Sequence, residues 1–81
     1  MRFEFSTKAY DEYESFSVEL RRTACKQIGH LVKNIRHPSL HAKKYDESIG
    51  LWQARINKSW QFYFFVIRDT YYIVSIRKHS K

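Results

Sequence analysis

The stretch LWQARINKSWQFYFFVIRDTYYIVSIRKHSK, residues 51–81, decides the fold of this chain. It contains three apolar runs, at residues 51–56, 60–67 and 71–77, which are separated by short polar segments. Because these runs are rich in β-branched and aromatic residues, they predict three strands of an antiparallel meander. The middle run is apolar at nearly every position, so we expect it at the centre of the sheet.

Polar side chains recur at every second position of the two outer predicted strands. Alternate residues of a strand point to the same face. Gln53 and Arg55 therefore share a face on the first strand, and Ser75, Arg77 and His79 share one on the last. A sheet face with this set of side chains is suited to binding a phosphate backbone.

The residues before this stretch predict a strand followed by two helices. Residues 2–5 alternate between polar and apolar, which indicates a short strand, and Ser6 or Thr7 can cap the helix expected at residues 8–15. Residues 18–36 carry apolar side chains at spacings of three and four, as an amphipathic helix does. That helix should end near His37, because Pro38 disfavours helical geometry in the residue before it.

Residues 39–50 show no clear period, and we expect a basic loop there. The predicted architecture is one α+β domain over residues 1–81: an N-terminal strand, two helices, and a three-strand antiparallel meander that forms one sheet packed on the helices. Trp52, Ala54 and Ile56 should face the helices, and Cys25 should be a buried or half-buried helix residue.

The chain is strongly basic, with a net charge of +7, and the excess lies in its C-terminal half. Residues 36–81 carry nine basic and three acidic side chains, against six and five in residues 1–35. Such a positive field attracts polyanions. Nucleic acid fits this charge, and so would an anionic membrane surface or an acidic protein.

The composition also limits the expected location and the expected cofactors. The sequence shows no signal peptide or long apolar run, and its single Cys25 cannot form an internal disulfide. We therefore expect a cytoplasmic protein without a membrane partner. The spacing of the histidines and Cys25 matches no standard zinc pattern, so we expect no metal site and no cofactor.

The order of elements, with the hairpin LWQARINKSWQFYFFV and the following YYIVSIRKHSK, resembles the RelE/ParE superfamily of bacterial toxins. The resemblance covers essentially the whole chain and rests on a loose pattern of strands and basic residues. It implies the toxin of a type II toxin–antitoxin system, neutralised by a cognate antitoxin in a hetero-oligomer. In the RelE branch it implies a ribosome-dependent endonuclease that acts on mRNA; in the ParE branch it implies a protein that acts on DNA gyrase.

The RelE-type pattern can be carried onto this chain residue by residue. It places basic residues on the first meander strand, where this chain has Gln53 and Arg55. It places an arginine after the aromatic residue that opens the next strand, where this chain has Trp60 and then Gln61. It places a catalytic arginine or histidine at the end of the last strand, where His79 falls. Many relatives continue to a further tyrosine or histidine, whereas this sequence ends at Lys81.

RNA cleavage by its own 2′-hydroxyl requires a base, an acid and cations that stabilise the transition state, and it requires no metal. Arg55 suits the cationic role and His79 the transfer of a proton. Tyr63, which shares a face with Gln61, either packs in the sheet or stacks on a base and positions the hydroxyl. The residues expected to hold RNA are Lys43, Lys44, Gln53, Arg77, Lys78 and Lys81.

Two classes of function stay open from the sequence. The basic face and His79 favour an mRNA endonuclease with Arg55, His79, Gln61 and Tyr63 at its site. Gln61 and the short C-terminus favour a non-enzymatic inhibitor of DNA gyrase, or a toxin relative that has lost cleavage and still binds RNA or antitoxin.

Overall fold

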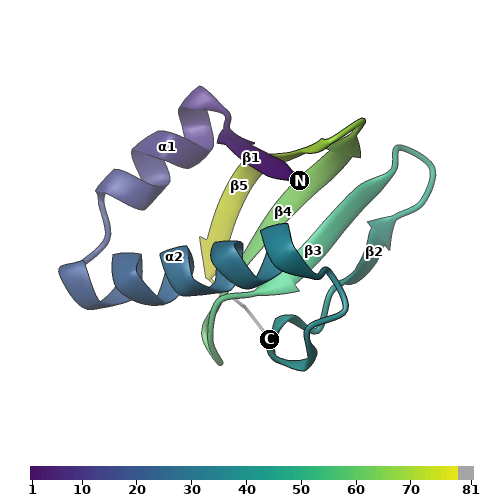
Figure 1. Ribbon diagram of the computed structural model, residues 1–81. Helices are drawn as coiled ribbons and strands as arrows, with labels where there is room; N and C mark the ends of the chain where they lie inside the picture. Colours follow the sequence, from purple (N-terminus) through teal and green to yellow (C-terminus); the bar gives the residue numbers. More distant parts are fainter. Residues whose placement is uncertain (79–81) are drawn as a thin grey trace.

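The computed structural model describes residues 1–78, which form a mixed sheet and two α-helices (Figure 1). The elements in chain order are β1 (Arg2–Phe5), α1 (Thr7–Glu14), α2 (Val18–Lys33), the 3-10 helix η1 (Pro38–Leu40), β2 (Lys43–Asp46), β3 (Leu51–Arg55), β4 (Trp60–Ile67) and β5 (Thr70–Lys78). The predicted α+β class and the meander of β3, β4 and β5 are confirmed.

The sheet has the order β1-β5-β4-β3-β2, so β4 is central, as predicted. β1 pairs with β5 in parallel, and the other neighbouring strands are antiparallel. Figure 1 shows α2 crossing one side of the sheet and α1 lying next to the C-terminal half of β5. Within residues 1–78 no helix covers the opposite side of β3, β4 and β5.

The core lies between α2 and the covered side of the sheet. Ile28 and Leu31 of α2 and Phe62 and Phe64 of β4 are almost completely buried. The prediction for β3 is confirmed, because Ala54 and Ile56 are buried and the partly buried Trp52 packs against them. On β3 and β4 this packing uses every second residue and turns the residues between them to the open side.

Both helices begin at serine caps. The Ser6 hydroxyl accepts a hydrogen bond from the amide of Ala9 at 3.0 Å, and the Ser17 hydroxyl accepts one from Leu20 at 3.1 Å. α2 ends at Lys33, so the prediction of a helix as far as residue 36 is wrong. Asn34 stops it, because its backbone is extended and its side chain accepts the amide hydrogen of Arg36.

The segment predicted as a loop contains a fourth member of the antiparallel part of the sheet. β2 pairs with β3, with Lys43 opposite Gln53 and Lys44 opposite Trp52. A bulge then shifts the register between Lys44 and Asp46. A short edge strand of this kind has no apolar period of its own, since it forms by pairing with β3.

α1 completes the edge of β5 that β1 leaves uncovered. β1 pairs with β5 only as far as Ile73. Beyond that point the Ser6 hydroxyl donates to the carbonyl of Val74 at 3.1 Å, and the Glu12 carboxylate accepts the amide hydrogen of Ile76 at 2.8 Å. Side chains at the start and middle of α1 therefore satisfy strand groups that would otherwise need another strand.

Cys25 is exposed on α2, so the expectation of a buried or half-buried residue is wrong. Its sulfur lies 2.9 Å from the hydroxyl of Tyr13 on α1, and Ala24 takes the buried position next to it. Neither helix within residues 1–78 has the length and apolar character that crossing a membrane would demand.

Candidate functional site

The open side of the sheet brings together polar side chains from the three neighbouring strands β3, β4 and β5. In one row across the strands, Gln53 pairs with Tyr63 and Tyr63 with Ser75. In the next row, Arg55 pairs with Gln61 and Gln61 with Arg77. The sheet therefore places together the residues that the sequence predicted for one face: Gln53, Arg55, Gln61, Tyr63, Ser75 and Arg77.

These side chains are connected by hydrogen bonds. The Gln53 amide nitrogen donates to the Gln61 oxygen at 3.1 Å, and the Gln61 nitrogen donates to the Tyr63 hydroxyl at 3.0 Å. On β5 the Arg77 Nε donates to the Ser75 hydroxyl at 3.1 Å. The network holds the middle of the face in one arrangement and sets the arginines on either side of Gln61.

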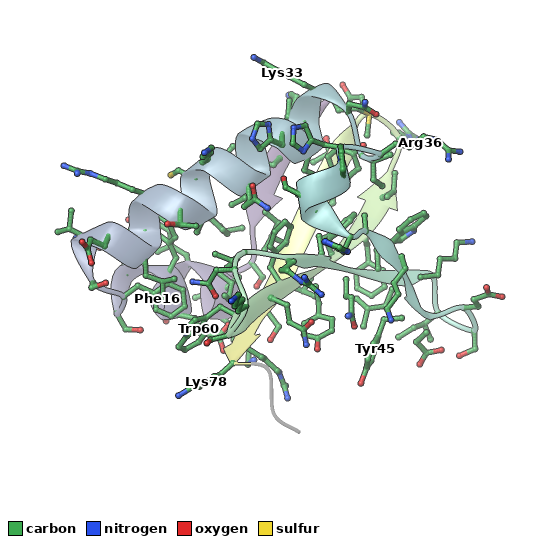
Figure 2. All side chains as sticks on the ribbon, turned by 90° about the horizontal axis from the view of Figure 1, so that it is seen from below. Phe16, Lys33, Arg36, Tyr45, Trp60 and Lys78 are labelled. Carbon is green, nitrogen blue, oxygen red and sulfur yellow. The ribbon has the colours of Figure 1, made fainter. Side chains whose placement is uncertain are left out.

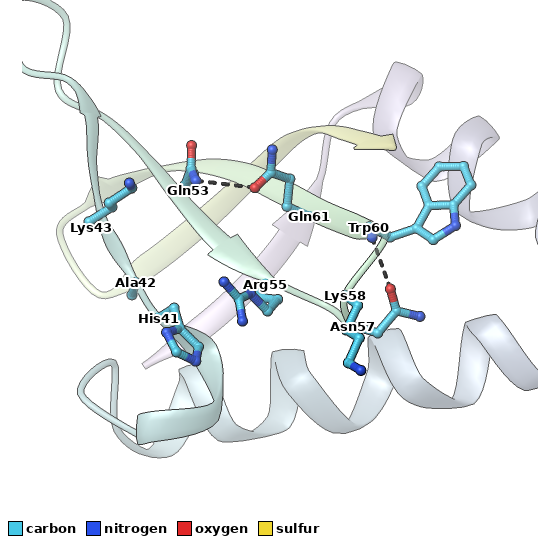
Figure 3. A pocket seen from close by; sticks show the side chains of 9 residues that line it. All are labelled: His41, Ala42, Lys43, Gln53, Arg55, Asn57, Lys58, Trp60 and Gln61. Carbon is cyan, nitrogen blue, oxygen red and sulfur yellow. Dashed lines mark hydrogen bonds between the residues drawn. The ribbon is translucent and has the colours of Figure 1, made fainter. Parts of the chain in front are cut away.

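Arg55 stands in a hollow of about 510 Å³ at the end of β3 (Figure 3). Figure 3 shows its guanidinium pointing to the side of His41, with Lys58 on the other side of the Arg55 side chain. Lys43 and Gln53 line the same hollow, and no aspartate or glutamate of the described residues does. Within residues 1–78 neither Arg55 nor Lys43 forms a salt bridge. The hollow is therefore a cationic site without a bound carboxylate, which suits a phosphate.

The backbone of Arg55 is held by Gln27, a buried polar residue of α2. The Gln27 amide nitrogen donates to the Arg55 carbonyl at 2.9 Å and to the Ser39 carbonyl at 3.2 Å. The Ser39 hydroxyl donates to the Gln27 oxygen at 3.2 Å. Through one side chain, α2 fixes both the end of β3 and the η1 segment that leads to His41.

Tyr63 keeps its proton under ordinary conditions. Partial burial raises the pKa of its hydroxyl above the usual value of 10.0, and the nearby Tyr45 acts in the same direction. Arg77 and the hydrogen bond from Gln61 oppose this shift. The hydroxyl accepts from Gln61 and can donate its hydrogen to a ligand, so Tyr63 is suited to orienting a group or giving a proton.

The remaining predicted RNA-binding residues are placed apart from one another. Lys43 joins Arg55, but Lys44 lies on the other side of β2, with its ammonium 5.8 Å from the centre of the Trp52 ring. Lys78 is exposed next to Arg77 in β5, so its side chain points to the opposite side of the strand from that of Arg77. His79 and Lys81 lie outside the described residues.

The structure adds four residues to this site and its support that the sequence did not single out. His41 and Tyr45 come from the segment predicted as a loop, and Lys8 comes from α1. Gln27 had a visible signal, because it is a polar residue within the apolar stripe of α2. The other three had none, since only the pairing of β2 and the packing of α1 bring them to the site.

No group of three potential metal ligands comes together among residues 1–78. His30 and His37 stack at a ring distance of 3.8 Å, on the side of the molecule where α2 lies. Partial desolvation lowers the pKa of His30, and the neighbouring positive charges lower it further. This pair lies apart from the row that contains Arg55.

Known structures share this fold over almost the whole chain. No protein-family model and no curated protein sequence matches. A YoeB/ParE toxin from Agrobacterium tumefaciens superposes with a TM-score of 0.82 at 15% identity, covering 99% of this chain and 100% of that one. The YoeB dimer from Staphylococcus aureus gives 0.82 at 18% identity, with 99% and 98% covered.

The isolated E. coli RelE toxin superposes with a TM-score of 0.77 at 14% identity, covering 99% of this chain and 85% of that one. The resemblance predicted from the sequence is thus confirmed for the fold, which is that of the YoeB and RelE toxins.

Proposed function

We propose that this protein is the toxin of a type II toxin–antitoxin system and that it cleaves mRNA on the ribosome through the 2′-hydroxyl of the RNA. The observation that supports this is the cationic hollow around Arg55, which is lined by no aspartate or glutamate of residues 1–78 and lies on the open face of a fold shared with YoeB and RelE toxins. Such a face is complementary to the phosphates of RNA.

Arg55 takes the role of stabilising charge in the transition state. Attack by the 2′-hydroxyl places an additional negative charge on the phosphate oxygens, and a guanidinium can bind two of them at once. Arg55 has no salt bridge to break within the described chain, and Gln27 holds its backbone. Arg77, across Gln61, supplies a second guanidinium to the same row.

Removal of the proton from the 2′-hydroxyl needs a basic group close to it. His41 lines the same hollow as Arg55, and its imidazole is suited to accept the proton of the 2′-hydroxyl. His79 is the second candidate for this proton transfer. The protonated Tyr63 hydroxyl is suited to orient the ribose or to donate to the leaving oxygen.

We propose a cognate antitoxin as the protein partner and the cytoplasm as the place of action. The similar solved structures include a YoeB–YefM complex from S. aureus and the intact RelBE toxin–antitoxin complex from E. coli. With a net charge of +7, this chain would favour an antitoxin segment rich in aspartate and glutamate. Such a segment would cover the cationic face in a hetero-oligomer and block access of RNA.

Expression of the protein without a partner tests the proposal. We expect growth arrest, and cuts within coding regions of cellular messages when these are mapped by primer extension. In single-turnover reactions on programmed ribosomes, Arg55→Ala should slow cleavage by a factor on the order of 10², by analogy with the loss of one oxyanion-type donor. Arg55→Lys should restore little, because an ammonium cannot bind two oxygens in the same way.

Arg22→Ala is the matched control, because it removes the same charge from an exposed position on α2. His41→Gln and His79→Gln, compared over a range of pH, identify which imidazole transfers the proton. Gln61→Arg should raise the rate, since it adds a guanidinium between Arg55 and Arg77. Growth arrest without cleavage by any variant would show that the protein acts by binding, and normal growth with abundant folded protein would contradict the toxin assignment.

A further inference from the structure

A second hollow, of about 430 Å³, lies on the same side of the sheet as the Arg55 hollow and has a different character. Tyr45, Leu51, Tyr63 and Val74 form its apolar and aromatic part. Lys8, Ser75 and Arg77 also line it, and among residues 1–78 no aspartate or glutamate does. It therefore combines an aromatic wall with a cationic rim.

The bulge in β2 places Tyr45 at this hollow. Lys44 pairs with Trp52 and Asp46 pairs with Leu51, so Tyr45 is the additional residue of the bulge. A bulge redirects the side chain that it carries. The Tyr45 ring meets the Tyr63 ring edge to face, with centroids 5.0 Å apart, and Figure 2 shows Tyr45 projecting from β2 away from α2.

The Tyr45 side chain is largely accessible to a ligand. The residue is 60% exposed, which is the highest value among the large hydrophobic residues exposed in the described chain. Its neighbour Tyr63 is held by the hydrogen bond from Gln61. An exposed ring supported by a fixed one forms a platform on which a flat group can stack.

Lys8 brings a positive charge from α1 to the rim. Its ammonium lies 3.2 Å from the Ser75 hydroxyl and 3.1 Å from the Glu12 carboxylate. Glu12 also accepts the amide hydrogen of Ile76, so the carboxylate that orients Lys8 is itself tied to β5. Arg77 stands on the same rim. Its Nε donates to the Ser75 hydroxyl, which also accepts from Lys8.

We propose that the Tyr45–Tyr63 hollow binds one unpaired nucleobase of single-stranded RNA, while the phosphates next to that base lie against Lys8, Arg77 and Arg55. This inference rests on the proposed function and names a base-binding subsite beside its cleavage site. Every base has a face that stacks on an aromatic ring. A duplex cannot use the hollow, because its bases are already stacked and paired.

The chemistry of the rim favours RNA over a protein side chain in this hollow. An apolar side chain of a protein partner would gain from the tyrosines, but it would offer no negative charge to Arg77, which forms no salt bridge within residues 1–78, whereas Lys8 already pairs with Glu12. A nucleotide satisfies both parts, since its base is flat and apolar on its faces and its phosphate is anionic. Gln61 and Arg77 lie between the two hollows, so one RNA chain can occupy both.

The test compares two ligands on the intact protein without ribosomes. The first is a short fluorescein-labelled single-stranded RNA, and the second is the same ribose–phosphate chain without bases. Fluorescence anisotropy should show that the wild-type protein binds the first at least about fivefold more tightly, the smallest effect expected for one base–aromatic stack. Tyr45→Ala should remove this difference, and Tyr45→Phe should keep it.

Tyr10→Ala is the control, because it removes a tyrosine that is 50% exposed on α1, away from the hollow. Lys8→Ala should weaken the binding of both ligands equally, since a phosphate contact does not depend on the base. The high exposure of Tyr45 makes folding of Tyr45→Ala secure, and thermal melting verifies it.

Equal affinity of the wild-type protein for both ligands, or unchanged discrimination in Tyr45→Ala, would overturn the subsite. Discrimination that is lost in Tyr45→Ala, together with no cleavage on ribosomes, would remove the nuclease proposal and leave the subsite standing. Cleavage on ribosomes without any discrimination between the two ligands would remove the subsite and leave the nuclease proposal standing.

Discussion

Replacing the buried Gln27 by methionine should destabilise the protein clearly, because this side chain ties three elements together. Gln27 is 6% exposed and bonds to both Ser39 and the carbonyl of Arg55. Methionine has nearly the same length, so the change removes hydrogen bonds and leaves the packing almost intact. It leaves two carbonyl oxygens facing a thioether, which cannot donate.

The magnitude follows from the three bonds. Each intramolecular hydrogen bond contributes about 1 kcal/mol net. The Ser39 hydroxyl retains its contact with the His37 ring at 2.8 Å, so the two bonds to carbonyl oxygens carry most of the effect. We expect the free energy of unfolding to fall by about 2–3 kcal/mol, and the melting temperature of a domain of this size to fall by roughly 10–20 °C.

Urea denaturation followed by circular dichroism measures this loss at equilibrium. Lys26→Met, at the exposed neighbouring position, is the control for the introduction of methionine into α2. An unchanged m-value would show that the denatured state is the same in both variants. A loss below about 0.5 kcal/mol in Gln27→Met would refute the view that Gln27 holds β3 and η1 together.

Three further predictions concern the edge strand, the histidine pair and the turn before β3. Lys43→Glu should weaken RNA binding and make it less dependent on salt. Lys44→Glu makes the same charge change on the other side of β2 and should have a smaller effect. Equal losses of RNA affinity in a salt titration would contradict this placement of the two lysines. Because the pKa of His30 is lowered in the folded state, the neutral imidazole favours folding. This contribution to stability should be complete above pH 6.5, the ordinary pKa of histidine, and be lost as the pH falls below that value. His30→Gln should flatten this dependence in melts across pH 5 to 8, and an unchanged slope would argue against His30 as its source. Gly50→Ala should cost about 1 kcal/mol in urea melts because Gly50 has a φ of +72°, while Gly29→Ala in α2 should be neutral or stabilising; the reverse order would contradict the turn geometry.

The residues of the meander show how much the sequence by itself determined. The alternation in residues 51–56 and 71–77 assigned Arg55 and Arg77 to one face and Ala54 to the other, and the structure confirms both. The nearly continuous apolar run of β4 predicted its central position correctly. These features were readable because the period of a strand is a local property of the chain.

The tertiary structure decided the features that depend on pairing across the sheet. β2 has no period, because a four-residue edge strand is specified by β3 and not by its own side chains. Its bulge sends Tyr45 to the open face, and its position relative to η1 brings His41 to Arg55. No local pattern could place these two residues at the site.

For the two helices, too, some features follow from the local sequence and others from the packing. The apolar spacing of α2 was correctly predicted, yet its end at Lys33 depends on the extended backbone of Asn34. Cys25 follows a buried alanine, and only the packing of α1 decides that it faces Tyr13 and solvent. The sequence thus determined which face of each element is apolar, since this follows from local periodicity. The tertiary structure decided which elements meet, because contacts between distant residues depend on the packing of the whole chain.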